Sequence, residues 1–323
     1  MKNSIEIDKN AFSCERRKGK KRKLWKCILR NWRVYVMFIP VALFYILFSY
    51  TPMYGIIIAF KDYYASMGIL GSPWVGFKYF EQLLKQTPQF WDALRNTVVI
   101  SVLKLCFCFP VPIIMSLFLN EIVFSKFKKA IQTAIYLPNF ISWVVISGII
   151  YELLSVNGGL VNNILMALGL DRVSFLTQPK MFYPILILSD IWKSAGWGTV
   201  IYISAISGIS PELYDAAEVD GCGRFGKMWR ITLPCIKSTI SMMLILQIGN
   251  IMNAGFDQVF NLYNKAVASV GEILDTLAYN IGIANGLVEK GAALGLFKTV
   301  INFVLLIGAN FASKKLNGVG LYE

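Results

Sequence analysis

Six long apolar segments recur along the 323-residue chain, and each is about as long as a membrane is thick. They cover residues 34–60, 96–119, 130–154, 183–207, 235–259 and 292–312. A helix crosses the hydrocarbon core of a bilayer in about 20 residues, and only helices or closed barrels can span it with every backbone polar group paired. With 56% hydrophobic and 16% charged residues, the chain is too apolar for an ordinary soluble domain. We therefore expect an all-α integral membrane protein with about six transmembrane helices.

Several of these segments contain proline or glycine, among them Pro40, Pro110, Pro138, Gly148 and Gly249. Bundled membrane helices tolerate such residues because neighbouring groups satisfy the backbone polar atoms that a break sets free. We therefore expect kinked helices and not straight rods.

Lysine and arginine residues are concentrated on one side of the expected membrane topology. Ten of them lie in residues 16–33, directly before the first apolar segment. Smaller groups follow the second, fourth and sixth segments, at residues 126–129, 224–230 and 314–315. Short loops rich in these residues stay in the cytoplasm. The distribution predicts that both termini are cytoplasmic.

The chain divides accordingly into a basic cytoplasmic segment at 1–33, a membrane domain at 34–312 and a cytoplasmic tail at 313–323. The basic segment adjoins a membrane span, so we expect it to contact anionic lipid. A net charge of +13 is also typical of nucleic-acid binding, but the basic run has few interleaved aromatic side chains. We expect no nucleic-acid partner.

The sequence excludes several kinds of catalytic site. The chain has no histidine, so it lacks Ser-His-Asp triads, Cys-His pairs and the His-Glu-x-x-His zinc motif. It also lacks the G-x-x-x-x-G-K-[ST] phosphate-binding loop. Residues 221–226 match G-x-G-x-x-G, but a dinucleotide site needs a strand before the glycines, and here a polar helix-forming stretch precedes them. We expect no enzyme activity, no metal site and no cofactor in this chain.

A polar stretch at 208–234 separates the fourth and fifth apolar segments. Ser210 is typical of a helix N-cap, and Gly221 is typical of the residue that ends a helix. A second short helix is predicted at 224–231, and Pro234 is expected to break it at the membrane surface. In so apolar a chain, this stretch is where we expect a soluble partner to bind.

The same stretch resembles a known family. Its pattern is an acidic residue with two alanines, three residues, glycine, nine residues and Ile-x-Leu-Pro, which is similar to the EAA loop of ABC importer permeases. The residues that match in register are Asp215, Ala216, Ala217, Gly221, Ile231, Leu233 and Pro234. Asp215 stands where the family more often has glutamate, which shortens the carboxylate arm and keeps its charge. Residues 48–55 and 71–77 look like the maltose-permease-like branch, which carries oligosaccharides and polysaccharide fragments.

The resemblance covers nearly the whole chain and implies a type I ABC importer permease fold in a bacterial cell membrane. It implies three partners: a second permease, so that the pair is a heterodimer, a cytoplasmic ABC ATPase dimer that binds ATP and Mg, and an extracellular sugar-binding lipoprotein. It also implies that residues 208–234 form a coupling loop, which docks as a helix into a cleft of the ATPase. The implied coupling residues are Asp215, Ala216, Ala217, Gly221, Leu233 and Pro234.

Polar residues recur at helical spacing inside the fourth and fifth apolar segments. They are Asp190, Ser194 and Trp197 in the fourth segment, and Gln247, Asn250 and Asp257 in the fifth. Polar groups are costly in lipid and usually face a bundle interior or a wet cavity. Carboxylate and amide groups beside an aromatic ring suit a sugar, and the resemblance to the maltose permease places its sugar contacts at about these positions. The six residues are therefore candidates for a substrate path.

A structural role for the same residues stays open. Asp190 can pair with Lys193 three residues later, and the amides can bond to neighbouring helices. Two other functions also stay open: an ABC importer permease for a non-sugar solute, and, as the less favoured reading, a secondary transporter. A secondary transporter is expected to show internal repeats, and the two halves of this chain share none that is convincing.

Overall fold

The computed structural model describes residues 30–318 and residue 320, and this part of the chain is helical without any strand. The all-α prediction is therefore confirmed. Most of the expected basic segment 1–33, including its run of lysines and arginines up to Lys26, lies outside the described residues. The chain forms two compact units, residues 1–56 and 57–323, which are described separately.

The described part of the first unit is a single helical stretch that continues across the boundary to Phe60. Its elements are α2 Trp32–Tyr45, the π-helix η2 Ile46–Tyr50, α3 Thr51–Met53 and the 3-10 helix η3 Tyr54–Phe60. Pro40 lies inside α2 and Pro52 lies in the first turn of α3. The first expected span, 34–60, is therefore helical throughout.

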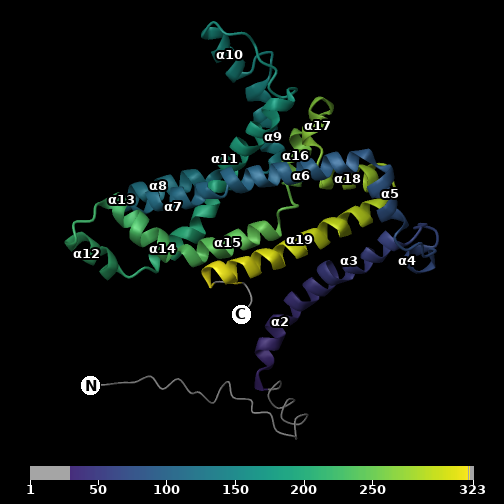
Figure 1. Cartoon of the computed structure of the whole chain (residues 1–323), viewed down its shortest axis with the longest axis horizontal. Coiled ribbons are helices and arrows are strands. Elements are labelled where there is room, and N and C mark those ends of the chain that lie inside the picture. The colour runs from purple at the N-terminus through teal and green to yellow at the C-terminus, as the bar shows by residue number, and fades with distance from the viewer. Residues whose placement is uncertain (1–29, 319, 321–323) are drawn as a thin grey trace. The chain divides into compact units, whose positions relative to one another are not determined.

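The second unit holds the remaining helices (Figure 1). The first of them are α4 Gly68–Gly71, α5 Lys78–Gln86, α6 Pro88–Phe107, α7 Pro110–Asn120, α8 Ser125–Tyr136, the 3-10 helix η4 Leu137–Phe140, α9 Trp143–Leu154, α10 Leu160–Ala167 and α11 Pro179–Ser207. They are followed by α12 Pro211–Val219, α13 Arg224–Lys227, the π-helix η5 Met228–Thr232, α14 Leu233–Cys235, α15 Lys237–Gly249 and α16 Phe256–Leu262. The last are the 3-10 helix η6 Lys265–Val267, α17 Ala268–Gly271, α18 Leu274–Tyr279, the π-helix η7 Asn280–Ala284 and α19 Val288–Asn317.

Three described helical segments are long and apolar enough to cross a membrane, namely Trp32–Phe60, Pro88–Asn120 and Val288–Lys315. The number rises to five if each of two bent helix pairs forms one span. Helix α11, which contains the fourth expected span, is 29 residues long and carries Asp190 and Lys193 near its middle. Helix α19 extends to Asn317, so the last helix continues into the expected tail 313–323.

The third expected span, 130–154, is sharply bent. Ser125–Phe140 and Trp143–Leu154 meet at 98°. Pro138 lies in the 3-10 turn η4, and Ser142 begins α9 as an N-cap whose side chain accepts a hydrogen bond from the Val145 N–H at 3.4 Å. The bend follows from a proline that cannot continue the helix and a serine that starts a new one. The predicted kinking is confirmed here.

The fifth expected span, 235–259, is not one helix, and this prediction was wrong. Helix α15 ends at Gly249, and the next helix, α16, starts only at Phe256. Gly255, directly before α16, has a φ of +93°, in the left-handed region that glycine adopts without strain. Met252 and Ala254 in this break are buried, whereas Asn250 and Asn253 are exposed. A hydropathy pattern does not distinguish apolar residues that are buried in the protein from those of a helix in lipid.

Helix α11 lies at the centre of the second unit and packs against α7 and α8. Two glycines permit this close approach. A Cβ added at Gly196 would lie 1.9 Å from the Ile135 carbonyl oxygen, and one added at Gly198 would lie 2.9 Å from Pro112. Small residues serve this purpose in membrane helix packing, since they let backbones come together. At the other side of the unit, α15 packs along α19.

Candidate functional site

The coupling loop, residues 208–234, starts with a well-capped helix. The Ser210 hydroxyl accepts a hydrogen bond from the Glu212 N–H at 3.3 Å, and Pro211 occupies the first helical position of α12. This N-cap prediction is confirmed. Proline suits that position because its missing N–H would have no partner there in any case.

Gly221 ends α12 by a geometry that requires glycine. Its φ is +73°, its N–H bonds to the Glu218 carbonyl at 3.0 Å, and the following Cys222 N–H bonds back to the Ala217 carbonyl at 2.8 Å. These two hydrogen bonds form a Schellman motif, which satisfies the last carbonyls of the helix. A Cβ at Gly221 would meet nothing within 4 Å, so backbone conformation and not space selects glycine here.

The base of the loop is packed against the membrane helices. Met228 is 6% exposed and clusters with Leu117, Tyr202, Ile206 and Ile236 of the surrounding helices. The Tyr214 hydroxyl lies 2.9 Å from the hydroxyl of Thr232, and this hydrogen bond joins α12 to η5. Thr232 is 1% exposed. On the outer side, the Lys227 ammonium pairs with the Glu218 carboxylate at 2.7 Å. The loop is therefore a rigid projection and not a flexible linker.

Pro234 does not break the helix where the sequence predicted. The chain stays helical through Cys235 and then bends by 61° before α15 begins at Lys237. Pro234 has no N–H for the Arg230 carbonyl four residues before it, and the preceding turn, η5, is a π-helix, which changes the hydrogen-bonding register. The backbone thus accommodates the proline by rearranging its turn, and the bend comes two residues later at Ile236.

No other part of the described chain covers the outer surface of α12. None of its residues is buried, and Leu213 and Val219 are 48% and 89% exposed. Asp215 and Ala216 are also exposed, whereas Leu233 packs against the cluster at the base. Figure 1 shows α12 and α13 at one end of the second unit, opposite α4 and α5. An apolar and acidic helix surface at the end of the molecule is suited to contact another protein.

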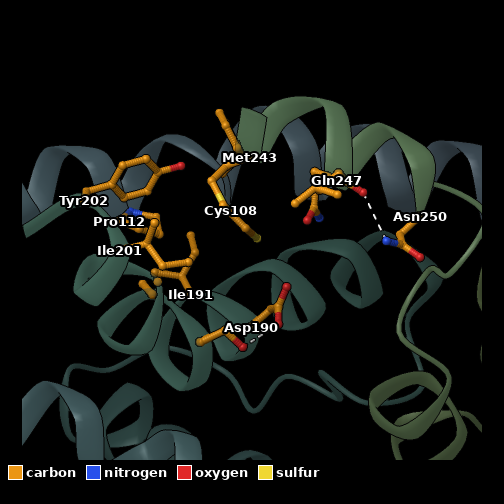
Figure 2. A pocket seen from close by; sticks show the side chains of 14 residues that line it. Cys108, Pro112, Asp190, Ile191, Ile201, Tyr202, Met243, Gln247 and Asn250 are labelled. Atoms are coloured by element: carbon orange, nitrogen blue, oxygen red, sulfur yellow. Dashed lines mark hydrogen bonds between the residues drawn. The ribbon is translucent and has the colours of Figure 1, made fainter. Parts of the chain in front are cut away.

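A cavity of about 290 Å³ lies among α7, α11 and the end of α15, and four of the six predicted substrate-path residues line it. They are Asp190, Ser194, Gln247 and Asn250. Figure 2 shows Asp190 on the α11 wall, with Gln247 and Asn250 on the α15 side. Apolar side chains, including Ile191, Ile201 and Met243, complete the wall beside the hydroxyl-bearing ring of Tyr202.

The other two predicted residues do not line this cavity. Trp197 is 51% exposed and makes an edge contact with Phe140 at a centroid distance of 6.0 Å. Asp257 lies exposed on α16, beyond the break that follows α15, so it shares no helix face with Gln247 and Asn250. The expected single stripe of Gln247, Asn250 and Asp257 was wrong, because it assumed one continuous helix.

Asp190 is held by residues that the sequence analysis did not single out. Its carboxylate lies 3.7 Å from the ammonium of Lys104 on α6 and accepts a hydrogen bond from Ser194 at 3.2 Å. Lys104 also donates to the Gln258 side chain at 2.5 Å. The alternative pair of Asp190 with Lys193 does not form, since Lys193 donates to the backbone carbonyls of Asn139 and Ile141. The sequence could have indicated Lys104, because it is an ionisable residue inside the second expected span.

Comparisons with known proteins agree with these features. Residues 107–317 match the family model described as the binding-protein-dependent transport system inner membrane component. The chain is 43% identical over 316 residues to the polygalacturonan/rhamnogalacturonan transport system permease protein YteP of Bacillus subtilis, covering 98% of this chain and 97% of that protein. It is 42% identical over 300 residues to the protein LplB of Bacillus subtilis, covering 92% and 94% of the two chains.

Solved structures give the same result. A chain in the crystal structure of a bacterial alginate ABC transporter, in complex with an alginate pentasaccharide-bound periplasmic protein, superposes with a TM-score of 0.84 at 39% identity. The match covers 93% of the present chain and all of that one. A second crystal structure of a bacterial ABC transporter, involved in the import of the acidic polysaccharide alginate, gives a TM-score of 0.84 at 40% identity, covering 91% and 99%.

The family assignment fixes the general role of the molecule. Its members are transport permeases and not enzymes. They lie in the plasma membrane and work together with a binding protein. Several long apolar helices in the described part of the chain fit a protein that crosses that membrane repeatedly. Given the matched region and the similarity along almost the full length, the chain belongs to the family of binding-protein-dependent transport system inner membrane components.

Proposed function

We propose that this chain is the permease subunit of an ATP-driven importer and forms the path for an oligosaccharide or polysaccharide fragment. The observation that carries the proposal is the similarity, along nearly the full length, to the polygalacturonan/rhamnogalacturonan permease YteP. The alginate transporter supports the same substrate class. The polysaccharides named for these two transporters contain sugar acids, so we extend the proposal to an acidic saccharide.

The coupling loop is the proposed contact with the ATPase. Asp215, Ala216 and Ala217 would lie in the docking surface, while Gly221 shapes the end of the helix. Leu233 and Pro234 would connect the docked helix to α15. This chain lacks a phosphate-binding loop, so ATP and Mg would be bound by the partner. Rigid packing at Met228 and Thr232 supports the transmission of movement from α12 to the membrane helices.

The cavity beside α11 is the proposed part of the sugar path. Asp190, Ser194, Gln247 and Asn250 bring a carboxylate, a hydroxyl and two amides to its wall, next to apolar side chains. Such a mixture suits a sugar, whose hydroxyl groups form hydrogen bonds and whose C–H faces contact apolar groups. Trp197 and Asp257 are left out of this proposed path because neither lines the cavity.

The arrangement in the cell is also part of the proposal. Both termini and the coupling loop would lie in the cytoplasm, and the α4–α5 region would face the outside. Basic residues within the coupling loop, at 224–230, and the position of the loop opposite α4 and α5 support this orientation. The chain would pair with a different permease and receive its substrate from an extracellular sugar-binding lipoprotein.

A purification followed by an uptake assay tests this function. The tagged protein is extracted from its native membrane in mild detergent, the co-purifying chains are identified by mass spectrometry, and uptake is measured with the complex reconstituted in vesicles. We expect a second permease, an ATPase, and ATP-dependent uptake of trigalacturonate in the presence of the binding protein. A matched complex lacking residues 211–223 is the control, and it should reach the membrane without uptake. Saccharide uptake that proceeds without ATP or an ATPase would contradict the proposal and favour a secondary transporter.

A further inference from the structure

The cavity beside α11 carries an unfavourable charge for an acidic substrate. Among the described residues that line it, Asp190 has the one charged side chain, which is 19% exposed. A carboxylate accepts hydrogen bonds from sugar hydroxyls, but it repels a sugar acid, and this repulsion is strong where water is scarce. A path for acidic saccharides therefore needs a cation that compensates Asp190.

Lys104 is placed to be that cation. Its ammonium lies 3.7 Å from the Asp190 carboxylate, and its side chain is 11% exposed. Lys104 does not itself line the cavity, so it acts on the cavity through Asp190. A buried charge is costly without a partner, which means that the pair is held together in the protein interior.

Neighbouring residues fix the position of the Lys104 ammonium. Gln258, 1% exposed, accepts a hydrogen bond from Lys104 at 2.5 Å and donates to the Leu186 carbonyl and the Ser189 hydroxyl. A Cβ added at Gly255 would lie 2.6 Å from the ammonium, so the missing side chain leaves room for it. Three elements, α6, α11 and the start of α16, thus hold Lys104 beside Asp190.

The nearby lysine of α11 does not take this role. Lys193 donates its hydrogen bonds to the backbone carbonyls of Asn139 and Ile141, and its ammonium lies 5.5 Å from the centre of the Trp143 ring. Lys193 is also absent from the cavity wall. It is therefore a matched control, a lysine on the same helix as Asp190 that does not contact the carboxylate.

We propose that Lys104 determines charge specificity: it neutralises Asp190, so that the cavity admits a saccharide that carries carboxylates. The inference rests on the proposed import of an acidic saccharide. Removal of Lys104 would leave a bare carboxylate, which selectively repels an acidic substrate and leaves a neutral one of the same shape unaffected.

The test is uptake of two matched saccharides by the complete transporter in vesicles, with the binding protein present at saturation for each. One saccharide is trigalacturonate, and the other is its neutral methyl ester. The variants are Lys104→Met, Lys104→Arg, Lys193→Met and the double variant Lys104→Met with Asp190→Asn. The amount of assembled complex in the vesicles is measured for each.

We expect Lys104→Met to lower the ratio of acidic to neutral uptake at least tenfold, which corresponds to about 1.4 kcal/mol. Lys104→Arg keeps the charge, and the double variant removes both charges, so both should keep a ratio close to that of the wild type. Lys193→Met should not change the ratio. A merely structural role for Lys104 would lower the uptake of both saccharides together.

The outcomes separate this inference from the proposed function. A wild-type complex that imports neither saccharide contradicts the function itself. A wild type that imports them, with an unchanged ratio in Lys104→Met, overturns the role of Lys104 alone. If the wild type imports only the acidic saccharide, Lys104→Met is compared with the double variant. An increase in uptake per assembled complex when Asp190→Asn is added to Lys104→Met supports the role of Lys104, and no increase overturns it.

Discussion

The hydroxyl groups of Tyr214 and Thr232 lie 2.9 Å apart and join the first helix of the coupling loop to the π-helical turn before α15. Thr232 is almost fully buried, so this hydrogen bond is shielded from water. A movement of α12 is therefore passed to η5 through a direct contact, and not only along the intervening residues of the chain. The first prediction follows from this contact.

Replacement of Tyr214 by Phe keeps the ring and removes the hydrogen bond. Such a bond contributes about 1 kcal/mol to stability. We expect Tyr214→Phe to assemble normally but to hydrolyse more ATP per saccharide imported, because α12 is less firmly fixed. Thr232→Val should have the same effect, and the double variant should be no worse than either single one. Additive effects of the two substitutions would show that the residues act independently.

The effect of a Gly221 substitution on uptake should depend on whether the new residue tolerates a positive φ. A left-handed backbone costs a side chain about 1–2 kcal/mol, and asparagine adopts it more easily than a β-branched residue. We expect Gly221→Val to lose most uptake and Gly221→Asn to keep much of it, with equal amounts of both in the membrane. Both substitutions add a side chain at a site with free space around the Cβ, so equal loss in the two variants would contradict this backbone explanation.

The ion pair of Glu218 and Lys227 predicts an acid-sensitive coupling loop. The hydrogen bond from Lys227, together with its charge, holds the pKa of the Glu218 carboxyl below its usual value of 4.5. A lowered folded-state pKa stabilises the loop above the usual pKa, and this contribution is lost as the pH falls through the lowered value. The effect is small because the Glu218 side chain is 76% exposed.

Hydrogen exchange measures this effect. Amide exchange of residues 218–227, corrected for its intrinsic pH dependence, should indicate more opening below about pH 4.5 than at pH 7. Glu218→Gln lacks the titrating group and should show a smaller change over the same range. An identical pH response in the two proteins would mean that another group controls the opening of the loop.

Two glycines of membrane helices should respond oppositely to alanine. Gly196→Ala places a Cβ 1.9 Å from the Ile135 carbonyl oxygen, and such overpacking typically costs about 1–3 kcal/mol. Gly148, inside α9, has nothing within 4 Å of an added Cβ, so Gly148→Ala should be neutral or gain up to about 1 kcal/mol from helix propensity. Thermal unfolding in detergent compares the two variants. A Gly196→Ala protein as stable as the wild type would show that α8 and α11 do not approach so closely.

Local patterns in the sequence were sufficient for the features that depend on neighbouring residues. The helical class, the N-cap at Ser210 and the glycine at the end of α12 were all predicted, because capping and hydrophobicity act over a few residues. The family was identified for the same reason, from a motif whose residues lie close together in the coupling loop. Four of the six path residues predicted from the sequence also line one cavity.

Contacts between distant segments were decided only by the tertiary structure. Asp190 pairs with Lys104, 86 positions earlier, and not with the nearby Lys193, because the folding of α6 against α11 brings the two charges together. The break before α16 separates Asp257 from Gln247. Hydropathy did not predict this break, because its buried residues Met252 and Ala254 are as apolar as those of a lipid-facing helix. Sequence by itself determined the apolar, helical character of the chain and the capped helix in residues 208–234, which rest on local composition and backbone preference. The charge compensation at the cavity was decided by packing, because electrostatic partners are chosen by distance in space and not along the chain.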